Sequence, residues 1–346
     1  MINNRAVLLA NAGIGVSYAD FKYADPSPAL PGGANFVVFS PDESAIAIGH
    51  TGSPPISIYA WSSFGFGAKY ANPADFNVGS GAPQAIRFSP DGSYFAFLRP
   101  DSLSLWRWSA VTGFGARYDY NFAVGFGAYD VRFSRSSNHV FVAGSYGGAP
   151  EGPAGILAIP YSSSGFGAAV TPAAALAGTR ASTLAVSPTG DYVVTGGIGI
   201  GVSAYQWTGS SFGSLSSISV GSNVGSIDFS PDGTVLAFGS TFSGTNIHNW
   251  SNGFGTLRSS INLGFITTVR FSNAGDKMLI GTSTVAMPPV YRLVAYRFGS
   301  RYRDPDVGPT VSVGSLRHSF SPSGDYIGIC SSASPRIFVY KTTNQP

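Results

Sequence analysis

One motif recurs through the whole chain and constrains its fold more than any other feature. A Phe-Ser-Pro-Asp segment, often followed by Gly, occurs in seven related copies whose serines are Ser40, Ser89, Ser134, Ser187, Ser230, Ser272 and Ser321. The intervals between these serines are 49, 45, 53, 43, 42 and 49 residues. A period of this length indicates a repeat architecture in which each unit is one supersecondary element.

Each copy of the motif predicts a tight turn between two strands. Ser, Pro and Gly are favoured at the first, second and fourth positions of a type I turn, where the Gly adopts the left-handed conformation. Glu43 and Ser137 replace this Gly in two copies, so we expect those turns to be strained or differently shaped. Runs typical of strands flank the turns, for example Ala85–Phe88 before one turn and Tyr94–Phe97 after it.

Two further strands complete each repeat. A third run, rich in β-branched and aromatic residues, ends in Trp followed by Ser or Thr in four copies, as at Trp61 and Trp108. A Phe-Gly pair then begins a short fourth run, as in Phe66–Tyr70. One sheet of four strands cannot bury both of its faces, but a ring of such sheets can. We therefore expect an all-β fold, a seven-bladed β-propeller with four-stranded antiparallel blades.

The two ends of the chain are predicted to close this ring. The segment Tyr18–Tyr23 has the pattern of a fourth strand, and Arg336–Tyr340 has that of a third strand, so the last blade joins N- and C-terminal strands. Closure of this kind removes the exposed sheet edges that promote aggregation. We expect a single propeller domain over residues 17–346 and an N-terminal extension over residues 1–16.

The composition excludes several other classes of protein. Of the 346 residues only 11% are charged and 14% are aromatic, which excludes a disordered chain and a helical bundle. The net charge of +3 comes from few charged residues, so nucleic acid is not expected as a partner. No apolar run approaches the roughly 18 residues of a spanning helix, so membrane insertion is not expected.

The turn motif and the Trp at the end of the third strand resemble the WD-repeat superfamily, and this resemblance implies a β-propeller. The chain departs from that family because Ser or Thr follows the Trp and the usual Gly-His pair is missing, so we expect the blades to depend more on apolar packing. The Phe-Gly-x-Lys/Arg-Tyr signature of Phe66–Tyr70 is similar to that of propellers among proteins of tailed bacteriophages. That second resemblance implies a particle component or a host-contact protein.

The sequence predicts no catalytic or metal site. His, Cys and carboxylate residues do not cluster at metal-ligand spacings, and Cys330 falls in a predicted strand, where we expect it to be buried and inert. Glycoside hydrolysis needs two opposed carboxylates. The sequence does not pair the candidates Asp20, Asp75, Asp119, Asp130 and Asp228. We therefore expect no enzymatic activity and no cofactor.

Four charged residues share one position in the repeat, directly before the motif Phe: Arg87, Arg132, Asp228 and Arg270. Since this position lies on the innermost strand of each blade, we expect these side chains to form a partial ring around the central channel. One interpretation is ion pairing between blades, for example Asp228 with Arg270. The other is a channel-mouth site for an anionic group or for an acidic side chain of a partner.

The sequence favours a non-enzymatic propeller that serves as a structural or adhesive interaction module, in a virion if the chain is phage-encoded. Its partners would be other proteins of a larger assembly, or a host-surface glycan. Two alternatives are a carbohydrate-binding or glycan-cleaving propeller and a cytoplasmic protein-binding scaffold of the WD-repeat type. The fold alone does not decide between them, because function resides in the site.

Overall fold

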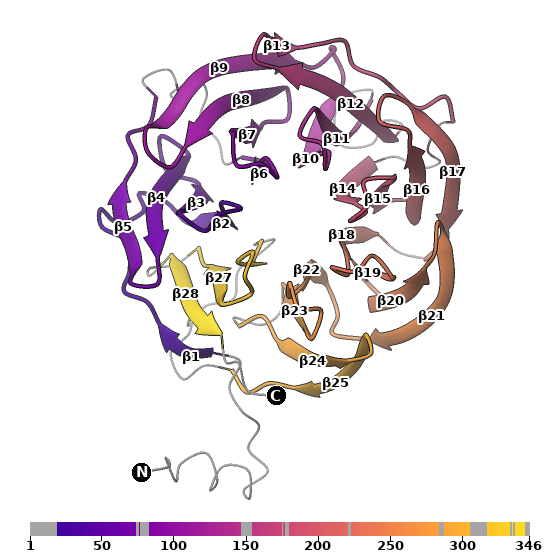
Figure 1. The fold of residues 1–346 in the computed structure, drawn as a ribbon. Coiled ribbons are helices and arrows are strands. Elements are labelled where there is room, and N and C mark those ends of the chain that lie inside the picture. Colours follow the sequence, from indigo (N-terminus) through magenta and orange to yellow (C-terminus); the bar gives the residue numbers. More distant parts are fainter. Residues whose placement is uncertain are drawn as a thin grey trace, which may run out of the picture.

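Seven antiparallel four-stranded sheets surround a central channel and form a ring (Figure 1). The computed structural model describes residues 19–73, 76, 83–146, 154–174, 176, 180–220, 223–283, 287–304, 317–332, 334 and 336–342. The predicted seven-bladed β-propeller is confirmed. The predicted extension over residues 1–16 lies outside the described residues.

The blades follow one another along the chain, and within each blade the strands run in order from the channel outward (Figure 1). Blade 1 consists of β2 (Ala34–Phe39), β3 (Ala45–His50), β4 (Ile56–Ser62) and β5 (Gly65–Lys69). Blade 2 consists of β6 (Ala85–Phe88), β7 (Tyr94–Leu98), β8 (Ser102–Ser109) and β9 (Gly113–Asn121). Blade 3 consists of β10 (Gly127–Phe133), β11 (His139–Ser145), β12 (Ala154–Ser162) and β13 (Gly165–Phe166). Blade 4 consists of β14 (Arg180–Val186), β15 (Tyr192–Ile198), β16 (Val202–Trp207) and β17 (Phe212–Ile218). Blade 5 consists of β18 (Val224–Phe229), β19 (Val235–Ser240), β20 (Gly244–Trp250) and β21 (Phe254–Ile261). Blade 6 consists of β22 (Ile266–Phe271), β23 (Lys277–Thr282), β24 (Val290–Val294) and β25 (Arg297–Arg301).

Blade 7 contains both ends of the described chain. Its strands are β26 (Ser319–Phe320), β27 (Tyr326–Cys330), β28 (Ile337–Thr342) and, outermost, β1 (Ala19–Lys22). Ala19 pairs with Thr342, and Lys22 pairs with Tyr340. The prediction that N- and C-terminal strands share the last blade is therefore confirmed.

The motif turns connect the innermost strand of each blade to the second strand. In blade 1 the Ser40 hydroxyl donates to the Asp42 carboxylate at 2.6 Å and accepts a hydrogen bond from the backbone N–H of Ala45 at 2.9 Å. The predicted strain at two turns has a definite form, because Glu43 and Ser137 adopt φ angles of 56° and 50° where other turns have Gly. Both turns keep the shape of the others, since the N–H of each residue still donates to the carbonyl of the first turn residue.

The core lies between neighbouring blades. Six of the seven second strands are buried along their whole length, which explains the apolar character of the sequence there. All five Trp side chains are at most 8% exposed, so they belong to the core. Trp61 packs edge-on against Tyr23 and Tyr326 of blade 7, at centroid distances of 5.1 and 5.3 Å.

The Tyr of the Lys/Arg-Tyr signature joins consecutive blades. The hydroxyls of Tyr23, Tyr70 and Tyr118 donate to backbone carbonyls of Ser63, Ala110 and Ser163, at 3.2, 2.6 and 2.7 Å. Each acceptor lies in the hairpin between the third and fourth strands of the next blade. In these three copies the signature therefore stabilises the ring, and the Tyr hydroxyls are engaged within the fold.

Candidate functional site

The four charged residues singled out in the sequence come together at the central channel. Arg87, Arg132, Asp228 and Arg270 are each the penultimate residue of an innermost strand, namely β6, β10, β18 and β22. Each pairs across to the same place in the second strand, as in Arg87 with Ala96 and Arg270 with Leu279. All four line one cavity of about 420 Å³, so the predicted partial ring is present.

Two further charged residues lie beside these four at the channel. Asp130 lies two residues before Arg132 on β10, and Arg317 lies three residues before Phe320 of β26. Because alternate residues of a strand point to the same face, a position two residues before the predicted one faces the channel as well. That period was the signal in the sequence that would have identified both residues. We call these six residues, Arg87, Asp130, Arg132, Asp228, Arg270 and Arg317, the channel cluster.

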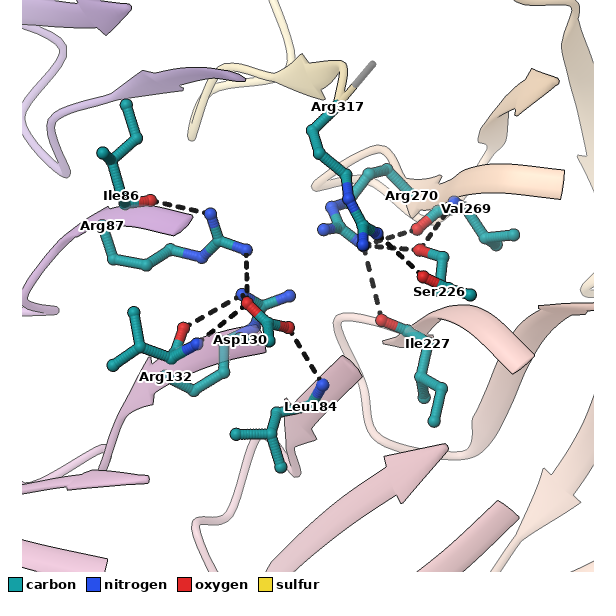
Figure 2. Close-up of polar contacts among 12 residues, drawn as sticks. Ile86, Arg87, Asp130, Arg132, Leu184, Ser226, Ile227, Val269, Arg270 and Arg317 are labelled. Atoms are coloured by element: carbon teal, nitrogen blue, oxygen red, sulfur yellow. Dashed lines mark hydrogen bonds and ion pairs between the residues drawn. The ribbon is translucent and has the colours of Figure 1, made fainter. Parts of the chain in front are cut away.

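Asp130 holds one half of the channel cluster together (Figure 2). Its Oδ1 accepts from Arg132 Nη1 at 2.9 Å and from Arg87 Nη2 of blade 2 at 3.2 Å. Its Oδ2 accepts from the backbone N–H of Leu184 in blade 4 at 3.0 Å. One carboxylate thus links three consecutive blades. The two arginines and the Leu184 N–H favour the ionised form, so the pKa of Asp130 is lowered despite its burial.

The other half of the channel cluster contains two arginines with neutral partners (Figure 2). Arg270 Nη1 donates to the carbonyls of Val269 and Ile227, at 2.7 and 3.4 Å, and to the Ser226 hydroxyl at 3.3 Å. Arg317 Nη1 reaches from blade 7 to the carbonyls of Gly225 and Thr267 at 2.8 and 3.0 Å. Among the described residues, no carboxylate forms an ion pair with either guanidinium.

Ion pairing between blades therefore occurs, but the predicted pair of Asp228 with Arg270 does not form. Arg270 turns toward carbonyls of blades 5 and 6, as described above, and Asp228 Oδ2 accepts a hydrogen bond from the backbone N–H of Phe271 at 2.9 Å. Arg87 and Asp130 form the pair that joins neighbouring blades. Burial raises the pKa of Asp228, and the charge of Arg270 only partly opposes this effect.

The channel cluster carries an excess of positive charge, because it contains four arginines and two aspartates. Burial is the largest cause that lowers the pKa of Arg317, to about 10, and the charges of Arg270 and Arg132 add to it. Burial and the neighbouring charge of Arg132 likewise lower the pKa of Arg87. Arg317 remains protonated at pH 7. By formal charge, the four arginines and two aspartates leave an excess of two positive charges.

The channel cluster is accessible from the face of the propeller that bears the motif turns. The walls of the cavity include the motif aromatics Phe39, Phe88, Phe229 and Phe271 together with Pro231 and Pro322 of the turns. A second cavity of about 390 Å³ shares Arg87, Arg132 and Asp228 and extends toward Pro41 and Pro90. An entering ligand would therefore pass an apolar rim before it meets the arginines.

The other candidate residues have structural partners. Asp119 accepts from the Ser104 hydroxyl at 2.6 Å and pairs with Arg117 at 2.9 Å, on the outer part of blade 2. Asp75 and the side chain of Asp20 lie outside the described parts of the structure. Cys330 is buried in β27 as predicted, and burial raises the pKa of its thiol. In the described ranges no group of three or more His, Cys, Asp or Glu residues could hold a metal ion.

Comparisons with known proteins bear on the fold. Within the part of the chain that the structure describes, no helix has the length and apolar character needed to cross a membrane. No family model and no curated protein matches the chain. Among solved structures, the β-propeller domain of Cps50 (Swd1) from Myceliophteria thermophila is similar, with a TM-score of 0.68, 12% sequence identity, and coverage of 94% of this chain and 99% of that domain. The chain therefore shares the β-propeller fold with that domain.

Proposed function

We propose that the chain is a non-enzymatic interaction scaffold, a structural or adhesive component of a bacteriophage particle, and that it binds its partner at the channel mouth. The excess positive charge of the channel cluster supports this proposal most directly. Arginines with reduced access to water destabilise a fold unless they are paired, and Arg270 and Arg317 have no carboxylate partner among the described residues. A partner that supplies negative charge would compensate for that cost.

Particle association tests this proposal. Particles from cells that carry the complete encoding genome are purified on a density gradient, and the chain is quantified by mass spectrometry against a known particle protein. We expect the chain to sediment with the particles at a fixed stoichiometry. Recovery of the chain only in the soluble fraction would contradict a role in the particle and would favour the cytoplasmic scaffold.

A glycan array with turnover assays tests the carbohydrate alternative. Sugar binding commonly uses an exposed aromatic face. Trp106 lines a cavity of about 260 Å³ in blade 2, but Phe76 stacks on it at 4.6 Å and Arg117 lies over it at 5.2 Å. This arrangement covers the indole, so we expect no glycan to bind in this cavity. Saturable binding of a glycan, or its turnover, would favour the carbohydrate alternative over the protein scaffold.

A further inference from the structure

The guanidinium groups of Arg270 and Arg317 are anchored at one end only. Every hydrogen bond that they make to the described residues comes from Nη1, and the acceptors are neutral oxygens of blades 5 and 6. Both side chains are only partly buried, and neither Nε nor Nη2 forms a hydrogen bond to a described residue. Because both residues line the same cavity, these atoms are available to a ligand there.

The free edge is the one that binds carboxylates best. Nε and Nη2 of an arginine present parallel N–H groups that match the two oxygens of a carboxylate. The anchored Nη1 fixes the orientation of this edge before a ligand arrives, and such preorganisation reduces the entropy lost on binding. Each of the two arginines can thus receive one carboxylate, and two carboxylates would balance the excess of two positive charges.

The spacing of the two arginines follows from their acceptors. Arg317 donates to the carbonyl of Gly225 and Arg270 to that of Ile227, which lies two residues further along β18. On β22 the corresponding acceptors are Thr267 and Val269, again two residues apart. Two residues of a strand span about 7 Å. The Nη1 atoms of the two guanidinium groups are therefore separated by about the spacing of alternate side chains in an extended peptide.

We propose that Arg270 and Arg317 receive two acidic side chains, two residues apart in an extended segment of a partner protein. This inference rests on the proposed scaffold function and names the chemistry of the partner. The two adjoining cavities of about 420 and 390 Å³ are larger than an inorganic anion requires, and their apolar Phe and Pro rim fits residues that flank the acids. Arg87 and Arg132 contribute less, because Asp130 already neutralises part of their charge.

Fluorescence anisotropy with short labelled peptides tests this inference. The probe is blocked Leu-Glu-Thr-Glu-Leu, and the control is Leu-Glu-Glu-Thr-Leu, which has the same charge but directs its two acids to opposite sides of an extended chain. We expect at least about tenfold tighter binding of the probe, since one charge-assisted hydrogen-bonded pair is lost with the control. Binding should weaken as sodium chloride is added. Equal affinity for the two peptides would overturn the inference.

Variants of the full chain locate the binding site. Arg270→Gln should weaken probe binding by about tenfold or more, and Arg270→Lys should restore it only in part, because Lys keeps the charge without the planar edge. The matched control is Arg292→Gln, which removes an exposed positive charge from β24 of the same blade. Circular dichroism and thermal unfolding check that each variant is folded. A folded Arg270→Gln variant that binds as tightly as the wild type would overturn the inference.

Competition distinguishes a peptide from a free anion. Acetate and inorganic phosphate should displace the probe only at concentrations far above those of the unlabelled peptide. Displacement by either anion at peptide-like concentrations would show that the site takes small anions and would overturn the peptide assignment. A chain that binds the probe but is missing from particles contradicts only the particle role. A chain in particles that fails to bind the probe contradicts only this inference.

Discussion

Asp130→Asn is expected to destabilise the propeller more than any other single change of a channel carboxylate. The Asp130 side chain is 6% exposed and accepts hydrogen bonds from Arg87, Arg132 and two backbone N–H groups. Asn retains the approximate shape but removes the negative charge. The two arginine side chains, 17% and 16% exposed, then face each other without a counter-ion.

The expected cost follows from this geometry. Removal of one partner from a buried ion pair costs about 3–5 kcal/mol. The partial exposure of both arginines places the expected loss at the lower end, about 3 kcal/mol. Because domains of this kind are stable by about 5–15 kcal/mol, this is a large fraction of the free energy of unfolding.

Equilibrium unfolding in urea measures this loss, with the fluorescence of the five buried Trp residues as the signal. Urea is uncharged and leaves the ion pairs unscreened. The control is Asp25→Asn, since the Asp25 side chain is 50% exposed and its pair with Lys22 at 2.8 Å is expected to contribute less than about 1 kcal/mol. If Asp130→Asn lowers the free energy of unfolding no more than Asp25→Asn does, the conclusion that Asp130 holds one half of the channel cluster together is wrong.

The pH dependence provides an independent check of the same reasoning. The pKa of Asp130 is lowered in the fold, so its contribution to stability is complete above the ordinary carboxyl pKa of about 3.9. As the pH falls through the lowered value, this contribution is lost. The difference between wild type and Asp130→Asn should therefore shrink in acid.

Three further outcomes are expected, each measured by urea unfolding. Asp228→Asn should raise the free energy of unfolding at pH 7, because burial raises the pKa of this carboxyl. This gain should fade as the pH falls toward 4. A lower free energy of unfolding of the variant at pH 7 would contradict the expectation. Ser137→Gly should stabilise the fold by about 0.5 kcal/mol, because Gly adopts the left-handed φ of 50° at this position without strain. Gly233→Ser, at a φ of 70°, should destabilise the fold by about 1 kcal/mol. If both variants changed the free energy of unfolding in the same direction, the strain argument would be wrong. Burial lowers the pKa of His318 to about 3. Through this residue the free energy of unfolding of the wild type should therefore fall by about 1.4 kcal/mol per pH unit below pH 6.5. His318→Asn should flatten that slope, and an unchanged slope would show that His318 does not contribute.

The sequence allowed the whole fold to be predicted because each repeat carries its own local signals. The Ser-Pro-Asp-Gly turns set the hairpins, the alternating runs set the strands, and the residue count outside the repeats required the ends to share a blade. The channel position of Arg87 and Arg270 followed from the same register. Asp130 and Arg317 lie two residues before that position, where the alternation of side chains along the strand, and not the repeated motif, directs them into the channel.

The partners within the channel cluster could not be predicted from the sequence. Asp228 and Arg270 occupy equivalent positions of neighbouring strands, which favoured a pair between them. The Arg270 guanidinium instead donates hydrogen bonds to three neutral oxygens, and the Phe271 N–H donates a hydrogen bond to one carboxylate oxygen of Asp228. Such choices depend on side-chain rotamers and on the depth of each group in the channel, which a repeat pattern does not specify.

Closure of blade 7 also determines the order of events during synthesis. Ala19 pairs with Thr342, so β1 leaves the ribosome 323 residues before its partner strand is complete. At the usual 5–20 residues per second, β1 waits about 16–65 s without a neighbour. Once β28 is complete, its outer edge can accept β1 of a second copy as well as its own β1, which is how domain-swapped dimers arise. The local concentration of nascent chains therefore determines whether β1 completes its own ring or that of a neighbouring molecule.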